Sequence, residues 1–131
     1  EISELLSLLP KSLGSFVQIL TTVNELGLGH LTLSRKTQTL SGGEIRRLKL
    51  CEHLARQKDT KRILIIDEPA AGLDPETADK VAAFIRKRAD LFSSVILIEH
   101  RSEVIRYADY EVKVGPSAGV EGGNIISQEF L

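Results

Sequence analysis

The sequence predicts an α/β fold with a helical N-terminal region, a parallel strand–helix–strand core and a C-terminal β-hairpin. Two short runs rich in isoleucine, leucine and valine, at residues 62–66 and 94–98, predict strands. The segment between them has helical periodicity, and a strand, a helix and a second strand in this order form a βαβ unit with parallel strands. Because both runs are unbroken rather than alternating, we expect these strands to be buried on both faces.

Composition indicates a globular domain or a part of one. The 131 residues are 42% hydrophobic and 27% charged, and the formal net charge of −1 argues against coating of nucleic acid by bulk charge. Between Arg46 and Arg62, however, seven basic residues stand against two acidic ones. This run fits either a solvated helix face or a docking surface for DNA or a partner, and whether Arg46 and Arg47 touch DNA stays open.

Cysteine content and the ends of the chain bear on its setting. The single cysteine, Cys51, excludes an internal disulfide and a cysteine-rich zinc site within the chain, and its helical spacing predicts a core position. No run of 18 apolar residues occurs, and the acidic start is unlike a signal peptide, so we expect a cytoplasmic location without membrane contact. The start without Met, in mid-pattern, indicates a portion of a longer protein.

The first region, residues 1–60, is predicted to be helical. Residues 2–8 form a helix that Pro10 punctuates. A second helix from about Leu13 carries one apolar face and stops at Gly27 and Gly29, before a polar connection at 32–39. The apolar face consists of Phe16, Leu20, Val23 and Leu26.

A third helix begins at the stretch Leu40-Ser41-Gly42-Gly43-Glu44. Ser41 and Glu44 have the spacing of a capping box, in which each side chain accepts a hydrogen bond from the other's backbone N–H. The two glycines have no capping role and cost roughly 1 kcal/mol each relative to alanine, so we expect a ligand, such as a nucleotide phosphate, to approach this backbone. The helix is predicted to run to about Gln57. It has Ile45, Leu48, Cys51, Leu54 and Ala55 on its inner face, with Arg46, Arg47, Lys49, Glu52, His53 and Arg56 largely on its other faces.

The second region, residues 61–131, contains the strands. Asp74 and Pro75 predict the N-cap and first residue of the helix between the core strands. A short helix at 102–107 follows the second strand, and two strand-like pieces, 110–114 and 124–128, are joined by a glycine-rich loop at 115–123.

Acid–base residues follow both core strands, at the edge where open α/β sheets bind ligands. Asp67 and Glu68 end the first strand, and Glu99 and His100 end the second. Asp67 could hold Mg²⁺ through its water shell, Glu68 could orient and deprotonate an attacking water, and His100 could contact a γ-phosphate or that water. Taken singly, each of these features also has a purely structural explanation.

In combination, LSGGE, ILIIDEP, GLDP and a strand ending in EH resemble, in order and separation, the ATP-binding-cassette (ABC) ATPases, a branch of the P-loop NTPases. The resemblance implies ATP and Mg²⁺ as cofactors. It makes 40–44 the signature motif, 63–67 the Walker B strand, Glu68 the catalytic glutamate, 71–74 the D-loop and His100 the switch histidine. The implied nucleotide-contacting residues are Ser41, Gly42, Gly43, Glu44, Asp67 and Asp74. The signature would contact ATP held by a second cassette in a head-to-tail pair.

The flanking segments 27–35, 105–109, 114–116 and 121–125 are similar to the excinuclease branch of this family, the damage-recognition ATPases of bacterial nucleotide excision repair, and more to their first cassette than to their second. That branch implies DNA, a homodimer of the parent protein and other excinuclease subunits as partners. Arg46 departs from the glutamine common in the family, and Asp74 from the histidine common in this branch. The alternatives are therefore a divergent paralogue, a transporter nucleotide-binding domain or an SMC-like protein.

The phosphate-binding motif G-x-x-x-x-G-K-[ST] is absent from the sequence. The chain is therefore expected to be a partial P-loop fold, the C-terminal part of one cassette, which alone neither binds ATP tightly nor hydrolyses it. A cassette without this loop could also serve as a docking module. In the family, the strand that precedes the phosphate-binding loop lies beside residues 94–98. We therefore expect a sheet edge there that lacks a partner strand and tends to associate.

Overall fold

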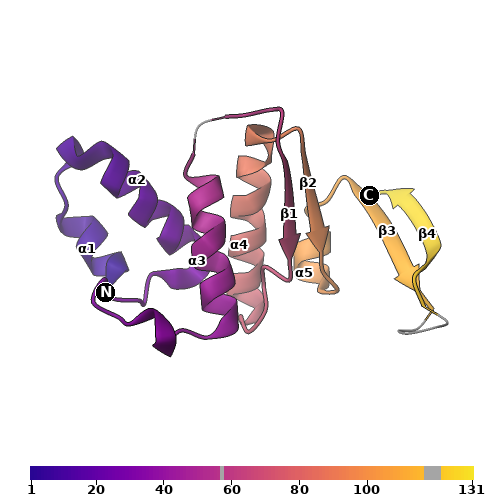
Figure 1. The fold of residues 1–131 in the computed structure, drawn as a ribbon, viewed down its shortest axis with the longest axis horizontal. Helices are drawn as coiled ribbons and strands as arrows, with labels where there is room; N and C mark the ends of the chain where they lie inside the picture. The colour runs from indigo at the N-terminus through magenta and orange to yellow at the C-terminus, as the bar shows by residue number, and fades with distance from the viewer. Residues whose placement is uncertain (57, 117–121) are drawn as a thin grey trace.

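The computed structural model describes residues 1–56, 58–116 and 122–131, and shows helices followed by a parallel strand pair and a separate hairpin (Figure 1). The helices are α1 (Ile2–Leu8), α2 (Gly14–Val23), α3 (Gly42–Leu54), α4 (Pro75–Arg88) and α5 (Ser102–Ile105). The strands are β1 (Ile63–Asp67), β2 (Ser94–Ile98), β3 (Tyr110–Gly115) and β4 (Asn124–Phe130). Short 3₁₀ turns lie at Lys11–Leu13, Thr37–Thr39 and Ala89–Leu91, and a π-helical segment lies at Asn24–Leu28.

The parallel strand–helix–strand unit is confirmed. β1 and β2 pair in parallel, with Ile63 opposite Ser94 at one end and Asp67 opposite Ile98 at the other. α4 connects them and begins as predicted, because the Asp74 carboxylate accepts a hydrogen bond from the backbone N–H of Thr77 at 3.0 Å and a proline occupies the first helical position.

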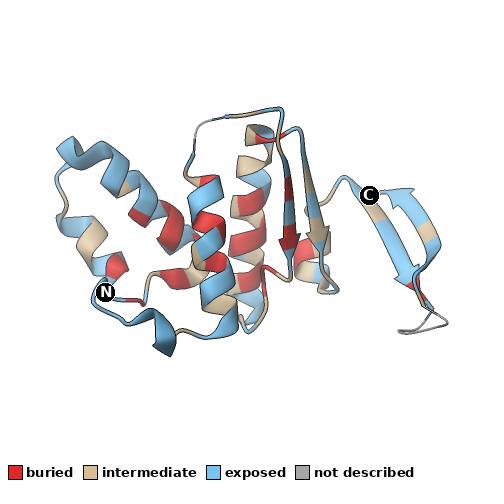
Figure 2. Cartoon of the chain, in the orientation of Figure 1, coloured by how far each residue is buried: buried red, intermediate tan, exposed pale blue. Residues whose placement is uncertain are grey.

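The hydrophobic core lies between the helices and one face of this strand pair (Figure 2). Leu64 and Ile66 of β1 are buried together with Val81 and Ile85 of α4 and with Leu54 of α3. Cys51 is also in this cluster, so its predicted core position is confirmed. One apolar cluster therefore joins residues from both halves of the chain.

The expectation that the strands are buried on both faces is wrong for the part of the chain that the structure describes. Ile63 and Ile65 of β1 are 60% and 63% exposed, and Ile96 and Ile98 of β2 are 49% and 54% exposed. The helices cover one face only, and successive strand residues point to opposite faces. An unbroken apolar run indicates that both faces are apolar, but does not supply the element that covers the second one.

The helix predicted from Leu13 is divided in the structure. α2 ends at Val23 and continues as the π-helical segment to Leu28, where Gly27 adopts a left-handed φ of 73°. Leu20, Val23 and Leu26 are buried as predicted. Phe16, in contrast, is 40% exposed and lies outside the buried core cluster.

The predicted C-terminal hairpin is confirmed by antiparallel pairing of β3 with β4, which stands apart from the helices (Figure 1). Tyr110 and Phe130 pack edge to face across it, with ring centroids 4.9 Å apart. Most of the glycine-rich connection predicted at 115–123 falls outside the described residues, as does Gln57, the predicted end of α3. None of the helices in the described ranges is long and apolar enough to span a membrane.

Candidate functional site

The acidic pair lies at the carboxyl end of β1. Asp67 is the last residue of the strand, and the backbone N–H of Glu68 donates to the carbonyl of Ile98 at 2.9 Å, which extends the pairing with β2 by one bond. Glu68 has a φ of 45°, a left-handed conformation that costs a non-glycine residue about 1–2 kcal/mol. Its carbonyl accepts from the N–H of Ala71 at 3.1 Å, which closes the turn that follows. Local strain thus coincides with the predicted catalytic residue.

His100 lies at the matching end of β2. Its side chain is 79% exposed, and its Nδ1 lies 3.6 Å from Oε1 of Glu99, whose own side chain is only 3% exposed. The same Oε1 accepts from the backbone N–H groups of His100 at 3.1 Å and Arg101 at 3.3 Å. Glu99 is thus the buried carboxylate that shapes the strand end, a role that its position before His100 alone did not reveal.

The start of α3 carries the predicted capping box. The Ser41 hydroxyl accepts from the Glu44 N–H at 3.2 Å, and a Glu44 carboxylate oxygen accepts from the Ser41 N–H at 2.8 Å. His30 contacts the other oxygen through Nε2 at 2.9 Å. The Ser41 N–H and then His30 lower the pKa of Glu44 to about 2, so the box is ionised at neutral pH.

The two glycines of α3 have different surroundings. A Cβ on Gly42 would meet no described atom within 4 Å, so space for a ligand is present there. A Cβ on Gly43 would lie 2.7 Å from the carbonyl oxygen of Ala71 and 3.2 Å from Nη1 of Arg47. Glycine at position 43 is therefore required by the close packing of α3 against the turn after β1. The sequence alone did not indicate this packing.

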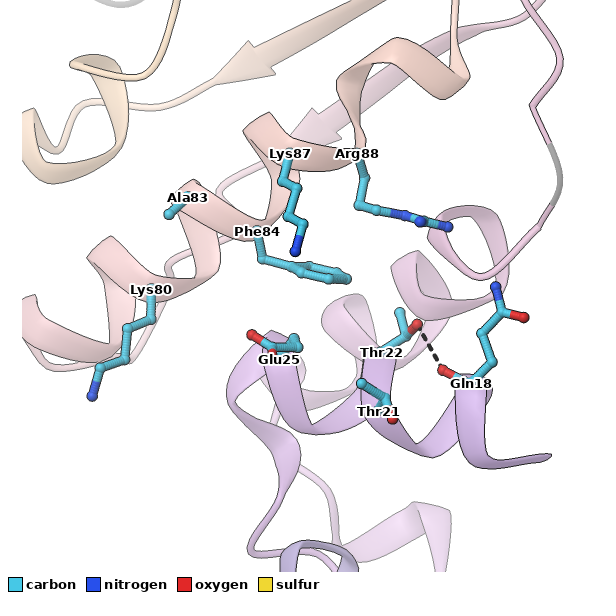
Figure 3. Close-up of a pocket in the computed structure, with 9 residues that line it drawn as sticks. All are labelled: Gln18, Thr21, Thr22, Glu25, Lys80, Ala83, Phe84, Lys87 and Arg88. Carbon is cyan, nitrogen blue, oxygen red and sulfur yellow. Dashed lines mark hydrogen bonds between the residues drawn. The ribbon is translucent and has the colours of Figure 1, made fainter. Parts of the chain in front are cut away.

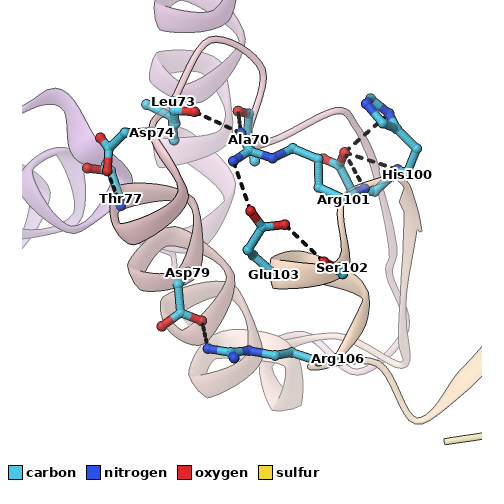
Figure 4. Close-up of polar contacts among 11 residues, drawn as sticks. Ala70, Leu73, Asp74, Thr77, Asp79, His100, Arg101, Ser102, Glu103 and Arg106 are labelled. Carbon is cyan, nitrogen blue, oxygen red and sulfur yellow. Dashed lines mark hydrogen bonds and ion pairs between the residues drawn. The ribbon is translucent and has the colours of Figure 1, made fainter.

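The turn at residues 70–74 connects the acidic pair to α4 (Figure 4). Gly72 adopts a φ of 75° in it, and Asp74 ends it as the cap of α4. The hydrogen bonds from Thr77 lower the pKa of Asp74. In this structure Asp74 is therefore a helix cap, and its predicted contact with nucleotide stays a prediction.

Arg47 was predicted to lie on the polar side of α3, and this is wrong. It is 4% exposed, and its Nη1 donates to the carbonyl of Ala71 at 2.9 Å. Residues 43 and 47 are four apart and share one helix face, which packs against the turn. In the same basic run, Arg56 pairs with Glu52 and Arg62 with Asp59. Arg47 is therefore not available to DNA in this structure, and Arg46 remains exposed.

The structure brings the predicted residues to one end of the molecule. The register of β1 and β2 places Asp67, Glu68 and His100 at the same sheet edge, and α3 and α4 begin at that end (Figure 1). Contact between the Gly43 backbone and the turn at Ala71 places Ser41 on the same side.

Two cavities among the described residues lie away from this edge. One of about 520 Å³ lies between α2 and α4, lined among others by Thr22, Glu25, Phe84 and Lys87 (Figure 3). Another of about 890 Å³ follows β2 toward β3. Neither of these two cavities is lined by the predicted site residues.

Among the known proteins to which this chain is similar are UvrA proteins. No family model matches the chain. UvrABC system protein A of Rickettsia bellii is 41% identical over 107 residues, and that of Streptococcus pneumoniae is 42% identical over 108 residues. Both matches cover 82% of this chain and 11% of the relative. A crystal structure of UvrA2 from Deinococcus radiodurans superposes with a TM-score of 0.79 at 34% identity, and covers 87% of this chain and 14% of that one.

The parallel strand pair and the structural similarity give the chain the fold of part of an ABC-type ATPase cassette. Within that class, it is a homologue of one short segment of UvrABC system protein A, or UvrA. The chain spans 11% of the length of these relatives.

Proposed function

We propose that the chain is the C-terminal portion of an ATPase cassette in a UvrA-like protein, in which ATP binding and hydrolysis regulate DNA binding during nucleotide excision repair. The observation that supports this most is the alignment of Asp67, Glu68 and His100 at one edge of the parallel strands. The similarity to UvrABC system protein A supports the repair setting, with DNA, a second copy of the parent protein and other excinuclease subunits as partners.

The residues at the sheet edge fit magnesium-bound ATP. Asp67 carries a carboxylate at the end of a strand, a donor of the kind that Mg²⁺ takes through its water shell. Glu68 would accept a proton from the attacking water, and the exposed ring of His100 would donate to the γ-phosphate or orient that water. Mg²⁺ would neutralise charge that develops on the phosphate oxygens.

The start of α3 would serve ATP bound to another cassette. The Ser41 oxygen already accepts from Glu44, so its O–H remains free to donate to a phosphate. Open space beside Gly42 and the positive end of the α3 dipole favour an anion there. The predicted phosphate contact of Gly43 would have to come from its backbone N–H, because the direction in which a Cβ would point faces the turn at Ala71.

The catalytic assignment is tested by Glu68→Gln in the full-length parent protein. Glutamine keeps the size of the side chain and removes the proton acceptor, so we expect nucleotide binding within twofold of wild type and a fall of turnover of at least about 100-fold. Glu76→Gln, which changes an exposed glutamate in the first turn of α4, is the matched control and should leave turnover unchanged. Equal turnover in Glu68→Gln and wild type would contradict the assignment.

The role of Ser41 is tested separately by Ser41→Arg in the same protein. A bulky cation at the start of α3 should prevent ATP-dependent pairing of cassettes while each cassette still binds nucleotide. Pairing is read by chemical crosslinking or sedimentation with ATP present. An unchanged ATPase rate and unchanged pairing would leave Ser41 as a helix cap only.

A further inference from the structure

Two arginines from different elements hold the turn at residues 70–74. Arg47 of α3 donates from Nη1 to the carbonyl of Ala71 at 2.9 Å. Arg101, just after β2, donates from Nη1 to the carbonyls of Ala70 at 3.0 Å and Leu73 at 2.8 Å (Figure 4). Three of the five carbonyls in this turn thus accept from guanidinium groups.

The buried charge of Arg47 indicates that its position matters. At 4% exposure, burial lowers its pKa, and its recorded hydrogen bond within the described ranges goes to a neutral carbonyl rather than to a carboxylate. Burying a charge without a carboxylate partner is unfavourable, because a hydrogen bond to a neutral carbonyl offsets only part of the lost hydration. Gly43 makes room for it, because a Cβ there would lie 3.2 Å from Nη1.

Arg101 connects the turn to the other strand end. It follows His100 directly, and the backbone N–H groups of both residues donate to the same oxygen of Glu99. Its side chain is 19% exposed and also lies 3.4 Å from Glu103. The guanidinium that holds the turn and the imidazole of His100 therefore share one anchored stretch of backbone.

We propose that Arg47 and Arg101 are positioning residues that lock the turn between the start of α3 and the end of β2, so that Ser41, Glu68 and His100 keep fixed relative positions. This inference rests on the proposed function for the meaning of those three residues. These hydrogen bonds need no nucleotide, and they add to the hydrophobic core a direct polar connection between α3 and the turn that follows Glu68.

The lock is tested by NMR on the 131-residue chain without ATP. In the wild type, we expect the guanidinium protons of Arg47 to exchange with water at least about tenfold more slowly than those of Arg46, its exposed neighbour on α3. Equal exchange rates would overturn the proposal even if every variant failed to fold.

The link across the turn is tested by Arg101→Met. It should move the carbonyl ¹³C resonances of Ala70 and Leu73 and also the amide resonances of Gly42 to Glu44. Arg101→Lys should restore part of the amide positions, because an ammonium can still donate to these carbonyls. Arg106→Met is the matched control: it removes an arginine that follows α5 and pairs with Asp79, and should leave both sets of resonances in place.

Amide resonances at 42–44 that stay fixed in a folded Arg101→Met chain would show that the turn does not connect the two ends, and would overturn the proposal. Failure of the proposed function would appear differently, as normal turnover in Glu68→Gln of the parent protein. The two failures are therefore distinguishable.

Discussion

Glu44 connects the protonation of one residue to the stability of the chain. Its pKa in the folded state is about 2, below the ordinary 4.5, because the ionised carboxylate accepts from Ser41 and contacts His30. A group with a lowered folded pKa adds stability above its unfolded pKa, and loses it as the pH falls through the folded pKa. The contribution should therefore be complete above about pH 4.5 and vanish toward pH 2.

Glu44→Gln should flatten this dependence. Between pH 5 and pH 2.5 we expect the unfolding free energy of wild type to fall by at least about 1.4 kcal/mol more than that of the variant, the equivalent of one pKa unit. Urea unfolding followed by circular dichroism measures both. Glu25→Gln, at an exposed carboxylate, should keep the wild-type slope. Parallel slopes in all three proteins would mean that the capping box is not formed in solution.

The thiol of Cys51 is expected to be unreactive in the folded chain. Burial raises the pKa of its thiol to about 11, and the reactive thiolate is therefore scarce near neutral pH. At pH 8 a thiol reagent should label the folded chain at least about 100-fold more slowly than the urea-unfolded chain. Comparable rates in the two states would place Cys51 outside the core.

The strands β1 and β2 show which level of structure the local sequence determines. Their positions, parallel pairing and helix caps follow from short-range signals, such as apolar runs and the Asp74-Pro75 pair, and these predictions are confirmed. Coverage of the second sheet face depends on elements far away in the chain or outside it, and no local pattern encodes it. The division at residues 60 and 61 stays a prediction.

The candidate site, too, was predictable from the sequence only in part. Asp67, Glu68 and His100 could be located because carboxyl ends of parallel strands share an edge, although their chemical roles remain predictions. Arg47 and Arg101 could not be recognised as internal donors, since an arginine in a helix or loop ordinarily lies in solvent. Only the Gly43 spacing, four residues before Arg47, carried a signal of close packing.

Alternation along β1 gives a direct test of the sheet orientation. Ile66 lies in the core, so Ile66→Ala should lower the unfolding free energy by roughly 2–5 kcal/mol. Ile65 faces away from the helices, and Ile65→Ala should cost less than about 1 kcal/mol in this chain. Denaturant titration of both variants compares them. Equal losses would mean that both faces are covered in solution.

At the scale of the whole molecule, two features bear on activity and association. The sequence lacks the phosphate-binding motif, and the sheet of β1 and β2 has only two strands among the described residues. The 131-residue chain contains the acidic and histidine residues predicted to act in hydrolysis but no lysine-bearing phosphate loop. We therefore expect no ATP turnover above that of Glu68→Gln in the same chain. Measurable turnover that this substitution abolishes would show that the chain alone forms a working site.

The second edge of β2 has no strand partner within the described ranges, so we expect the chain to associate with itself as its concentration rises. Ile96→Lys places a charge on that strand and should weaken association. Leu8→Lys, which changes an apolar residue that is 79% exposed on α1, should not. Sedimentation velocity over a range of concentrations separates these cases. A wild-type chain that stays monomeric throughout would contradict the expectation.

The uncovered isoleucines also have a thermal consequence. Heat capacity rises on unfolding because apolar groups become hydrated, by about 12–15 cal/mol/K per residue in ordinary domains. Ile63, Ile65, Ile96 and Ile98 are already about half or more hydrated in the folded chain and add little to this change. The stability curve of the chain should therefore be flatter than its length suggests, with cold and heat affecting it less steeply than they affect a fully enclosed domain.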